Sequence, residues 1–313
     1  MVRFGFTSKG TQRWRCMSCG VSGIRIRPDN HLRIWRARLA LWLTNPETLT
    51  TQSKRWHINR RTSHRAFTSL WKEELHAPLL SLEDKALVLD ATALAPDLVA
   101  LIARTPDDGG LSFEFAEQES YESWKHLLSR LADTPRAVVS DAQKGLKKAI
   151  RERFPGVPIQ RCLMHVMRLA LAWITKRPQT AAGKTLRVLV KAMSHVWSEY
   201  EARVWTTWFL RWCIHYQCFL AERTMGADGC TSWWTHRKLR QTSSLLRRSI
   251  PELFTYTVFP GIPRTTNHVE GGINAGIAEV ISRHRGLTSA QKKTAVALFL
   301  NKRQMKKSTR NVS

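Results

Sequence analysis

Three carboxylates in this sequence have the types and positions needed for metal-dependent chemistry. Asp90 and Asp141 each follow a short apolar run, and Glu270 lies in a segment that is expected to open a helix. Such runs predict buried strands, whose ends are where catalytic groups collect in α/β sheets. Carboxylate oxygens are ligands that Mg²⁺ prefers, and a pair of such ions can activate a nucleophile and stabilise a leaving oxygen in phosphodiester chemistry. We therefore expect the three acids to form one metal site.

The balance of charge indicates the partner of such a site. Lys and Arg number 50 against 24 acidic residues, giving a formal charge of +26 and a pI near 10.7. The basic residues are spread along the chain rather than held in one tail. Counterion release from a polyanion would dominate the affinity of such a protein, so we expect nucleic acid to be its partner.

The apolar runs and the number of cysteines indicate the cellular compartment of the protein. No apolar run reaches the roughly 18 residues of a membrane-spanning helix, and the first residues lack the apolar region of a signal peptide. Six cysteines are too sparse for a disulfide scaffold in a chain of 313 residues. The sequence predicts a soluble intracellular protein whose cysteines are thiols or metal ligands.

The first two cysteines have the spacing of half a zinc site. Cys16 and Cys19 are separated by two residues and followed by Gly20, so both thiolates of a tight knuckle can face one metal. A structural zinc site takes four ligands, but no second cysteine pair precedes Cys16, and His31 lies outside the expected spacing. Two interpretations remain open: an incomplete Zn²⁺ site, or two free thiols.

The next segment has the pattern of a helix-turn-helix. Leu32, Trp35 and Leu39 recur at helical spacing, and Asn45-Pro46 ends that helix. A second short helix and a turn at 56–59 precede a helix over 60–71, whose Phe67 and Leu70 are expected to face inward. Its outer face is basic and is expected to bind DNA. The residues on that face are Arg60, Arg61, His64 and Arg65. A solvated basic face on an ordinary helical bundle is the alternative.

From about residue 82 the pattern changes to strands. Three strands joined by tight turns are predicted over 86–89, 98–103 and 111–115. Alternating elements follow: helix 119–131, strand 137–140, helix 143–154 and strand 158–162. This order is that of a ribonuclease-H-like fold, an α/β fold with a mixed five-stranded sheet. The first and fourth strands are neighbours in that fold, so Asp90 and Asp141 would meet at the carboxyl ends of the strands.

Four sequence fragments follow one another around the three acids. They are Val88-Leu-Asp90, Val139-Ser-Asp141-Ala-Gln-Lys-Gly-Leu146, Gln160-Arg-Cys162-Leu-Met-His165, and Ile262-Pro-Arg-Thr-Thr-Asn-His-Val-Glu270-Gly-Gly-Ile-Asn274 followed by His284-Arg-Gly-Leu287. Each fragment alone is a weak signal, but the four together are specific and cover about residues 80–300. In this order they resemble the motifs of DDE transposases of the bacterial Mutator-like insertion-sequence superfamily.

The resemblance implies a function. Asp90, Asp141 and Glu270 would be a catalytic triad that binds two divalent ions, Mg²⁺ or Mn²⁺. The protein would bind the ends of its element, then cleave and join double-stranded DNA, as a homodimer or larger assembly on DNA in the bacterial cytoplasm. Further residues of the active-site region would be the Cys-x-x-His pair and two residues before the Glu: Cys162, His165, Asn267 and His268.

The resemblance also extends to the N-terminus. Zinc ribbons open many transposases of this kind, and Cys16 and Cys19 resemble the second knuckle of such a ribbon. The first cysteine pair would lie just upstream of Met1, so we expect that this chain starts late.

The expected domains follow from these assignments. They are a partial zinc-ribbon knuckle over 1–28, a helix-turn-helix region over 29–78, a catalytic core over 80–170 and 255–303, an all-helical insertion over 171–254, and a basic tail over 304–313. In the insertion, Trp205, Trp208 and Trp212 are spaced as a packed helical face. Arg237 and Lys238 near its end are expected to contact DNA, with a solvated helix surface as an equally good explanation.

Other interpretations remain for the acids and for the whole chain. Asp90 and Asp141 fit ordinary strand ends, and Glu270 follows Asn267 at the spacing of a helix-capping box. Cys162 and His165 fit a buried thiol and imidazole better than an independent zinc site. The rival functions are a non-catalytic DNA-binding remnant or domesticated regulator, and a nuclease or resolvase that cuts without joining.

Overall fold

The computed structural model describes residues 1–24, 28–73, 75, 77 and 79–308, without the side chains of 28–30, 268, 270 and 305–308. The chain divides into two compact units. The first is Met1–His76 with Glu279–Phe299, and the second is Ala77–Ala278 with Leu300–Ser313.

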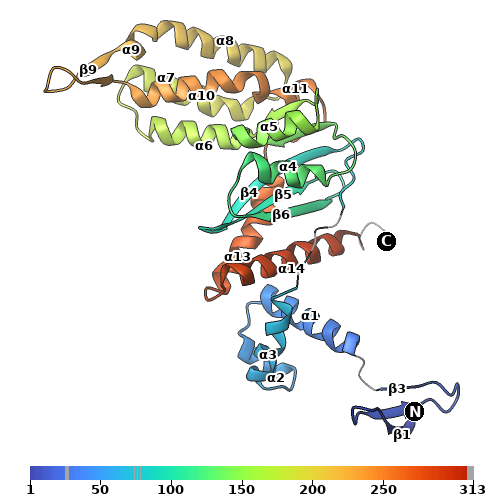
Figure 1. The fold of residues 1–313 in the computed structure, drawn as a ribbon. Helices are drawn as coiled ribbons and strands as arrows, with labels where there is room; N and C mark the ends of the chain where they lie inside the picture. Colours follow the sequence, from blue (N-terminus) through green and yellow to red (C-terminus); the bar gives the residue numbers. More distant parts are fainter. Residues whose placement is uncertain (25–27, 74, 76, 78, 309–313) are drawn as a thin grey trace. The chain divides into compact units, whose positions relative to one another are not determined.

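The second unit is built on a mixed five-stranded sheet (Figure 1). Its order is β6-β5-β4-β7-β8, in which β5 is antiparallel to β4 and β6, whereas β7 is parallel to β4 and β8. The strands are β4 (Ala86–Ala95), β5 (Leu98–Arg104), β6 (Leu111–Ala116), β7 (Ala137–Ser140) and β8 (Ile159–Arg161). The predicted α/β class and the predicted mixed sheet are confirmed.

Asp90 does not end its strand, contrary to the prediction. Strand β4 continues through Asp90 to Ala95, pairing with β5. The apolar run stops at Leu89 because the parallel pairing with β7 ends at Val88, so only β5 flanks β4 beyond that point. The sequence pattern marks the end of that pairing rather than the end of the strand. Asp141 does follow β7 directly, as predicted.

Two helices cover one face of this sheet. They are α4 (Tyr121–Ser129), capped by Ser120, and α5 (Lys144–Arg153). Trp124, Leu127 and Ile150 of these helices pack against Leu87 and Leu89 of β4 in one buried cluster. Because side chains alternate along a strand, the even-numbered residues of this part of β4, including Asp90, face the opposite side.

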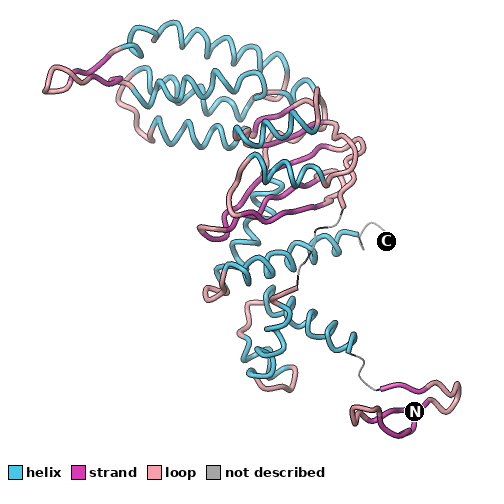
Figure 2. Tube along the Cα trace, in the orientation of Figure 1, coloured by secondary structure: helices cyan, strands magenta, loops and turns pink. Residues whose placement is uncertain are grey.

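A helical region follows β8 (Figure 2). Its helices are α6 (Leu163–Ile174), α7 (Ala181–Ala192), the 3₁₀ turn Met193–His195, α8 (Glu199–His215), α9 (Gln217–Ala221), α10 (Arg237–Leu253) and α11 (Thr255–Val258). The prediction of an all-helical region is wrong. Between α9 and α10 the chain forms an antiparallel hairpin of β9 (Arg223–Met225) and β10 (Ser232–Trp234), with Asp228 and the left-handed Gly229 in its turn.

The tryptophan face of α8 is only partly as predicted. Trp205 and Trp212 are buried and lie on either side of Phe209, whose ring is stacked with both. Trp208 is 57% exposed, so its inclusion in the packed face is wrong. The stripe runs through Phe209 because the buried face continues at i+4 from Trp205 rather than at i+3.

The first unit contains an antiparallel sheet and a helical part. The sheet joins β1 (Val2–Phe6), β2 (Gln12–Arg15) and β3 (Ser22–Ile24). The helices are α1 (Pro28–Thr44), α2 (Leu49–Arg55) and α3 (Arg60–Leu70). Trp35, Leu39 and Phe67 are buried, which confirms the apolar face predicted for the first helix and the inward Phe of the third.

The C-terminal helices complete the core of the first unit. The chain after α11 forms α12 (Asn267–Val269) and the π-helix Glu270–Asn274, followed by α13 (Ala275–Arg283) and α14 (Ser289–Ser308). Val280 and Ala295 belong to the same buried cluster as Trp35 and Phe67. The predicted catalytic core includes all of 255–303, whereas the structure groups Glu279–Phe299 with the N-terminal helices. In the described residues, no helix has the length and apolar character of a membrane span.

Candidate active site

Strands β4 and β7, which lead to the two predicted aspartates, are neighbours in the sheet. Strands β4 and β7 pair in parallel with Leu87 opposite Val138 and Val88 opposite Val139. Asp141 directly follows β7, and extending this register by two residues beyond the paired segment would set it opposite Asp90. By alternation, Asp90 faces the side of the sheet that α4 and α5 leave uncovered. The parallel pairing of β4 with β7 is the strand order that the sequence analysis predicted, and it brings the strand that contains Asp90 beside the strand that leads to Asp141.

Asp90 is held by an amide from the segment that contains Glu270. Its side chain is buried, and its Oδ2 accepts a hydrogen bond of 2.8 Å from Nδ2 of Asn274. The Oδ1 atom of Asn274 is also buried, and no described residue donates a hydrogen bond to it. A buried oxygen without a donor, next to a carboxylate, is the type of group that an oxygen-binding cation can use.

Asp141 lies in a strained turn between β7 and α5. Its Oδ1 accepts a hydrogen bond of 2.9 Å from the backbone N–H of Gln143. Ala142, between them, has a φ of 60°, which is in the left-handed region that residues with a side chain rarely adopt. The Ser140 hydroxyl supports this turn by accepting from the Ala142 N–H at 3.2 Å. The turn directs the chain into α5 and fixes the Asp141 carboxylate at the sheet edge.

Cys162 connects the end of β8 to the segment before Glu270. Its Sγ accepts hydrogen bonds of 3.3 Å from both the N–H and the hydroxyl of Thr266. Its own N–H donates to the Ser140 carbonyl at 2.6 Å, next to Asp141. Burial raises the pKa of the Cys162 thiol, but hydrogen bonds from His165 and Thr266 outweigh burial, so this pKa is lowered overall. The Cys-x-x-His pair therefore ties three parts of the candidate site together.

Glu119 is a site residue that the sequence analysis missed. It precedes α4, and its Oε1 accepts a hydrogen bond of 3.0 Å from the indole N–H of Trp124. Burial raises the pKa of Glu119, and the neighbouring charge of Asp141 raises it further, although Trp124 and His165 act in the opposite direction. An acid this close to Asp141 and His165 belongs to the same electrostatic site. No motif marked it, because its neighbours are distant in sequence.

A cavity of about 480 Å³ opens beside Asp141. Arg161, His165 and Arg168 are among its lining side chains, together with Leu245 of α10. Burial lowers the pKa of Arg161, while the charge of Asp141 raises it. A second pair of guanidinium groups, those of Arg104 and Arg303, lies near Gly272. Basic groups beside carboxylates suit a phosphate backbone approaching a metal site.

The structure describes the remaining predicted site residues only in part. Asn267 begins α12 and is exposed, and its N–H donates to the Thr265 hydroxyl at 3.3 Å. The side chains of His268 and Glu270 lie outside the described residues. Among the side chains that are described, no three His, Cys, Asp or Glu residues are grouped so that they could hold a metal ion. The described donors for a cation are therefore Asp90, Asp141 and the Asn274 oxygen.

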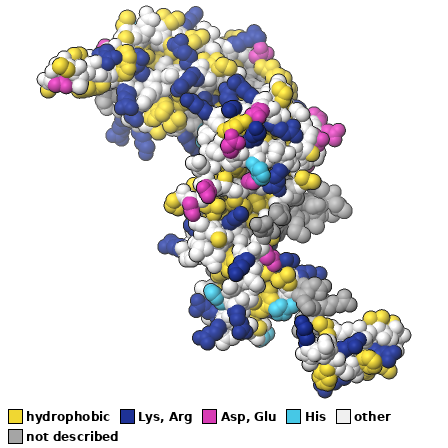
Figure 3. Space-filling model, in the orientation of Figure 1, with side chains coloured by type: hydrophobic (Ala, Val, Ile, Leu, Met, Phe, Trp, Pro, Cys, Tyr) yellow, Lys and Arg dark blue, Asp and Glu magenta, His cyan; other side chains and the backbone are white. Residues whose placement is uncertain are grey.

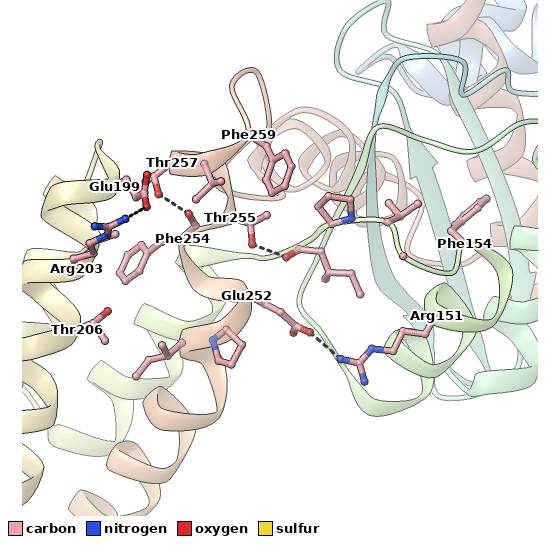
Figure 4. Close-up of a pocket in the computed structure, with 18 of the residues that line it drawn as sticks. Arg151, Phe154, Glu199, Arg203, Thr206, Glu252, Phe254, Thr255, Thr257 and Phe259 are labelled. Atoms are coloured by element: carbon pink, nitrogen blue, oxygen red, sulfur yellow. Dashed lines mark hydrogen bonds and ion pairs between the residues drawn. The ribbon is translucent and has the colours of Figure 1, made fainter.

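A larger cavity lies elsewhere in the second unit (Figure 4). Its volume is about 900 Å³, and it is lined by parts of α5, α8, α10 and α11. Its charged groups neutralise one another, since Glu252 pairs with Arg151 at 3.3 Å and Glu199 pairs with Arg203. None of the predicted site residues lines it, so size alone does not identify the site.

The N-terminal cysteines form the predicted knuckle-like turn. The Cys16 N–H donates to the Val21 carbonyl at 2.9 Å, and Gly20, with a φ of 72°, donates to the Cys16 carbonyl at 3.0 Å. The Ser18 hydroxyl and the backbone N–H groups of Cys19 and Ser18 lower the pKa of the Cys16 thiol from 9.0 to about 6. Backbone donors aimed at a thiolate are what a metal-binding knuckle requires.

We predict that Cys16 reacts with iodoacetamide as a thiolate at neutral pH. Because its pKa is lowered to about 6, the rate should rise through pH 6 and level off above pH 7. Mass spectrometry of the alkylated peptide at a series of pH values would measure this, with the exposed Cys230 as an internal comparison. A midpoint between pH 8 and 9 would contradict the prediction.

The predicted DNA-binding residues are exposed in both regions. Arg60, Arg61, His64 and Arg65 belong to α3, and the three arginines lie on its outer face. Arg237 and Lys238 begin α10 and are exposed too. The structure therefore leaves both groups accessible to a polyanion, as the prediction needs.

Comparisons with known proteins agree with the motifs. Comparison with curated proteins gave no match to this chain. A family model described as "Transposase, Mutator family" matches residues 107–216. The matched segment runs from just before β6 to the end of α8 and contains Asp141, Cys162 and His165. The resemblance to Mutator-family transposases that the sequence motifs indicated is thereby confirmed over these residues.

Proposed function

We propose that this protein is an insertion-sequence transposase that binds the ends of its element and catalyses DNA cleavage and strand transfer through Asp90, Asp141 and Glu270. The observation that carries the proposal is the parallel pairing of β4 with β7, whose register, extended by two residues, would set Asp90 level with Asp141. The family match supports it, because it includes Asp141. The sheet order, with β4 and β7 as parallel neighbours, is also the order expected of a ribonuclease-H-like fold.

The donor set suits a hard divalent cation. Asp90 and Asp141 offer carboxylate oxygens, and the Asn274 oxygen is buried without a described donor. With Glu270, these residues would hold Mg²⁺ or Mn²⁺, as one or two ions. Such ions, when bound, supply Lewis-acid activation of a water or hydroxyl nucleophile and stabilise the charge of the leaving oxygen.

The protein residues supply position and charge. Asn274 orients the Asp90 carboxylate, and the Gln143 N–H orients that of Asp141. Cys162 holds the Thr266 segment, which leads to Glu270, against the sheet. Arg161 and Arg168 line the cavity where a phosphate would lie. Water or a 3′-hydroxyl can then attack in line, so no covalent protein–DNA intermediate is needed.

DNA recognition would come from the basic helices. We propose that α2 and α3 form a helix-turn-helix with α3 as its recognition helix, and that the Cys16 knuckle is part of a zinc ribbon. Their support is the exposed basic face of α3 and the lowered pKa of Cys16. Arg237 and Lys238 would contact the DNA backbone from α10. A dimer or larger assembly on DNA would bring two element ends together.

A strand-transfer assay tests this function. The protein is incubated with Mg²⁺ and a supercoiled donor plasmid that carries the element's own ends, beside Asp141→Asn and Glu270→Gln variants. We expect cleavage at the ends and joining to a second DNA by the unchanged protein only. Cleavage without joining would identify a nuclease or resolvase, and DNA binding without cleavage would identify a non-catalytic regulator.

We predict that α3 contributes phosphate contacts that appear in the salt dependence of binding. Arg61 and Arg65 are exposed, and no described carboxylate pairs with either. The double variant Arg61→Gln, Arg65→Gln should reduce the slope of log K against log salt by roughly 0.9 for each phosphate that the variant no longer neutralises. Fluorescence anisotropy across a salt series measures that slope.

A matched control lies in the neighbouring helix. Arg55 of α2 is paired with Glu47 at 2.7 Å, so Arg55→Gln removes one positive charge, against two in the double variant, without removing a phosphate contact. That variant should leave the slope nearly unchanged. If the double variant in α3 behaved in the same way, α3 would not be the DNA-binding helix.

A further inference from the structure

A second, smaller pocket in the helical region is lined by indole and guanidinium groups. It has a volume of about 420 Å³ and lies between the end of α6, strand β10 and the first half of α10. Figure 1 shows α6 and α10 running side by side, with the β9–β10 hairpin beyond them. Its lining residues are Trp173, Trp234, Arg237, Arg240, Gln241, Ser244 and Arg248. The proposed catalysis uses none of its aromatic residues.

The pocket has excess positive charge. Its lining contains three arginines and no acidic residue, and none of the three has an ion pair in the described part of the chain. Two are fixed by backbone carbonyls: Arg240 donates to Leu220 O at 2.9 Å, and Arg248 donates to Ser244 O at 3.2 Å. Figure 3 shows Lys and Arg side chains gathered over this helical region. Fixed guanidinium groups without counter-charges suit a phosphate.

The two indoles have different surroundings. Trp234 holds guanidinium groups against its ring, with Arg240 at 3.6 Å and Arg223 at 4.6 Å from the centroid. These contacts account for how the hairpin packs on α10. Trp173 is only half-buried, and the described residues place neither an aromatic ring nor a cation against it. The packing of the hairpin therefore does not use Trp173, whose ring is available to stack on a flat group.

Two helices that line this pocket, α6 and α10, also line the cavity beside Asp141. Along α6, the lining passes from His165 and Leu169 in that cavity to Trp173 in this pocket. Along α10, it passes from Leu245 to its neighbour Ser244. Eight residues of helix separate His165 from Trp173, about 12 Å at 1.5 Å per residue. In a strand with stacked bases, where each nucleotide rises by roughly 3.4 Å, that length spans three or four nucleotides.

We propose that this pocket binds an unpaired nucleotide of the DNA strand that is cleaved at Asp141, with its base stacked on Trp173 and its phosphate held by Arg237 and Arg248. The proposal rests on the proposed function, because the strand enters from the active site. An indole needs an exposed base face, which a paired and stacked duplex does not offer, whereas an unpaired base does. The groove between α6 and α10 would guide that strand from Asp141 to Trp173.

Binding of tailed duplexes tests the proposal without any catalysis. Fluorescence anisotropy without divalent metal measures the affinity of the full chain for two DNAs. One is a duplex with an unpaired tail of about four nucleotides, and the other is the same duplex with a tail of abasic sugars. The phosphates are equal, so the difference reports the base. We expect the tail with bases to bind about five- to a hundredfold more tightly, the range for one stacked base.

Three variants assign that difference to the pocket. Trp173→Leu should reduce the preference for bases to less than about twofold, and Trp173→Phe should restore part of it, since a smaller ring still stacks. Arg248→Gln should weaken both tailed duplexes equally and reduce the salt slope by roughly 0.7, the value for one phosphate of a single strand. Trp233→Leu is the matched control, because Trp233 is exposed on the same strand as Trp234 but does not line the pocket.

The outcomes separate this proposal from the proposed function. Equal binding of base and abasic tails by the unchanged protein, an unchanged preference in Trp173→Leu, or an unchanged affinity of Arg248→Gln for both tailed duplexes would overturn the proposal for this pocket and leave the proposed function standing. Competition by a free mononucleotide at micromolar concentration would also overturn it, in favour of a nucleotide-binding site. Absence of binding to any duplex would instead count against the proposed function.

Discussion

Asp141→Asn is expected to lower the rate of DNA cleavage by roughly a thousandfold, which corresponds to about 4 kcal/mol of activation free energy. A neutral amide cannot supply the negative charge that a divalent cation requires. The fold should be unaffected, because an asparagine oxygen can still accept the hydrogen bond that Asp141 Oδ1 receives from the Gln143 N–H. Asp90→Asn should have an effect of similar size, since its oxygen can still accept from Asn274.

A charge-matched control separates a missing metal ligand from a missing charge. Asp107 lies near the start of β4, where its Oδ2 accepts the N–H of Ala86 at 2.9 Å. Asp107→Asn removes one negative charge from the same sheet, but at the end away from the candidate site. Single-turnover cleavage of a labelled element end and anisotropy on the same DNA measure rate and affinity. Cleavage by Asp141→Asn within tenfold of the unchanged protein would exclude Asp141 as a metal ligand.

The largest expected effect on stability is that of Trp124→Ala. The ring of Trp124 is fully buried between α4 and the sheet, and its N–H donates to Glu119 at 3.0 Å. Removing a buried Trp side chain costs about 3 to 5 kcal/mol, because apolar burial is removed and a cavity forms. Urea unfolding followed by circular dichroism measures the decrease in stability.

Two other tryptophan variants separate the contribution of the hydrogen bond from that of burial. Trp124→Phe keeps most of the buried surface and removes the hydrogen bond, which should cost about 1 to 2 kcal/mol. Trp208→Ala removes the same atoms from a position that is 57% exposed, and should change the free energy of unfolding by less than about 0.5 kcal/mol. Similar decreases for Trp124→Ala and Trp208→Ala would show that the described core of this sheet is wrong.

The sequence predicts local elements well because apolar periodicity reports burial directly. The strand at 137–140 is predicted at the bounds observed, and the helix ended by Asn45-Pro46 ends at Thr44. A strand segment that is buried on both faces gives a continuous apolar run, whether or not the strand ends where the run ends. For that reason the run before Asp90 resembles a whole strand, although β4 continues to Ala95 where only one neighbour remains.

The contacts that complete the candidate site could not be predicted in this way. Asn274 meets Asp90 across 184 positions, and Thr266 meets Cys162 across 104. Neither pair leaves a periodic signal, since each depends on how the π-helix segment packs on the sheet. Glu119 was missed for the same reason. The hairpin at β9–β10 was missed because its strands are short and follow helical sequence, although Gly226 and Gly229 marked its turn.

Metal rescue of Asp141→Cys tests the central claim most directly, namely that Asp141 holds the divalent cation that cleavage requires. A thiolate is a softer ligand than a carboxylate and favours Mn²⁺ over Mg²⁺. Cleavage of the element end would be measured in each metal for the unchanged protein, Asp141→Cys and Asp141→Asn. We predict that Asp141→Cys is inactive with Mg²⁺ and regains activity with Mn²⁺, whereas Asp141→Asn stays inactive in both. Equal activity of all three proteins in Mg²⁺ would contradict the account.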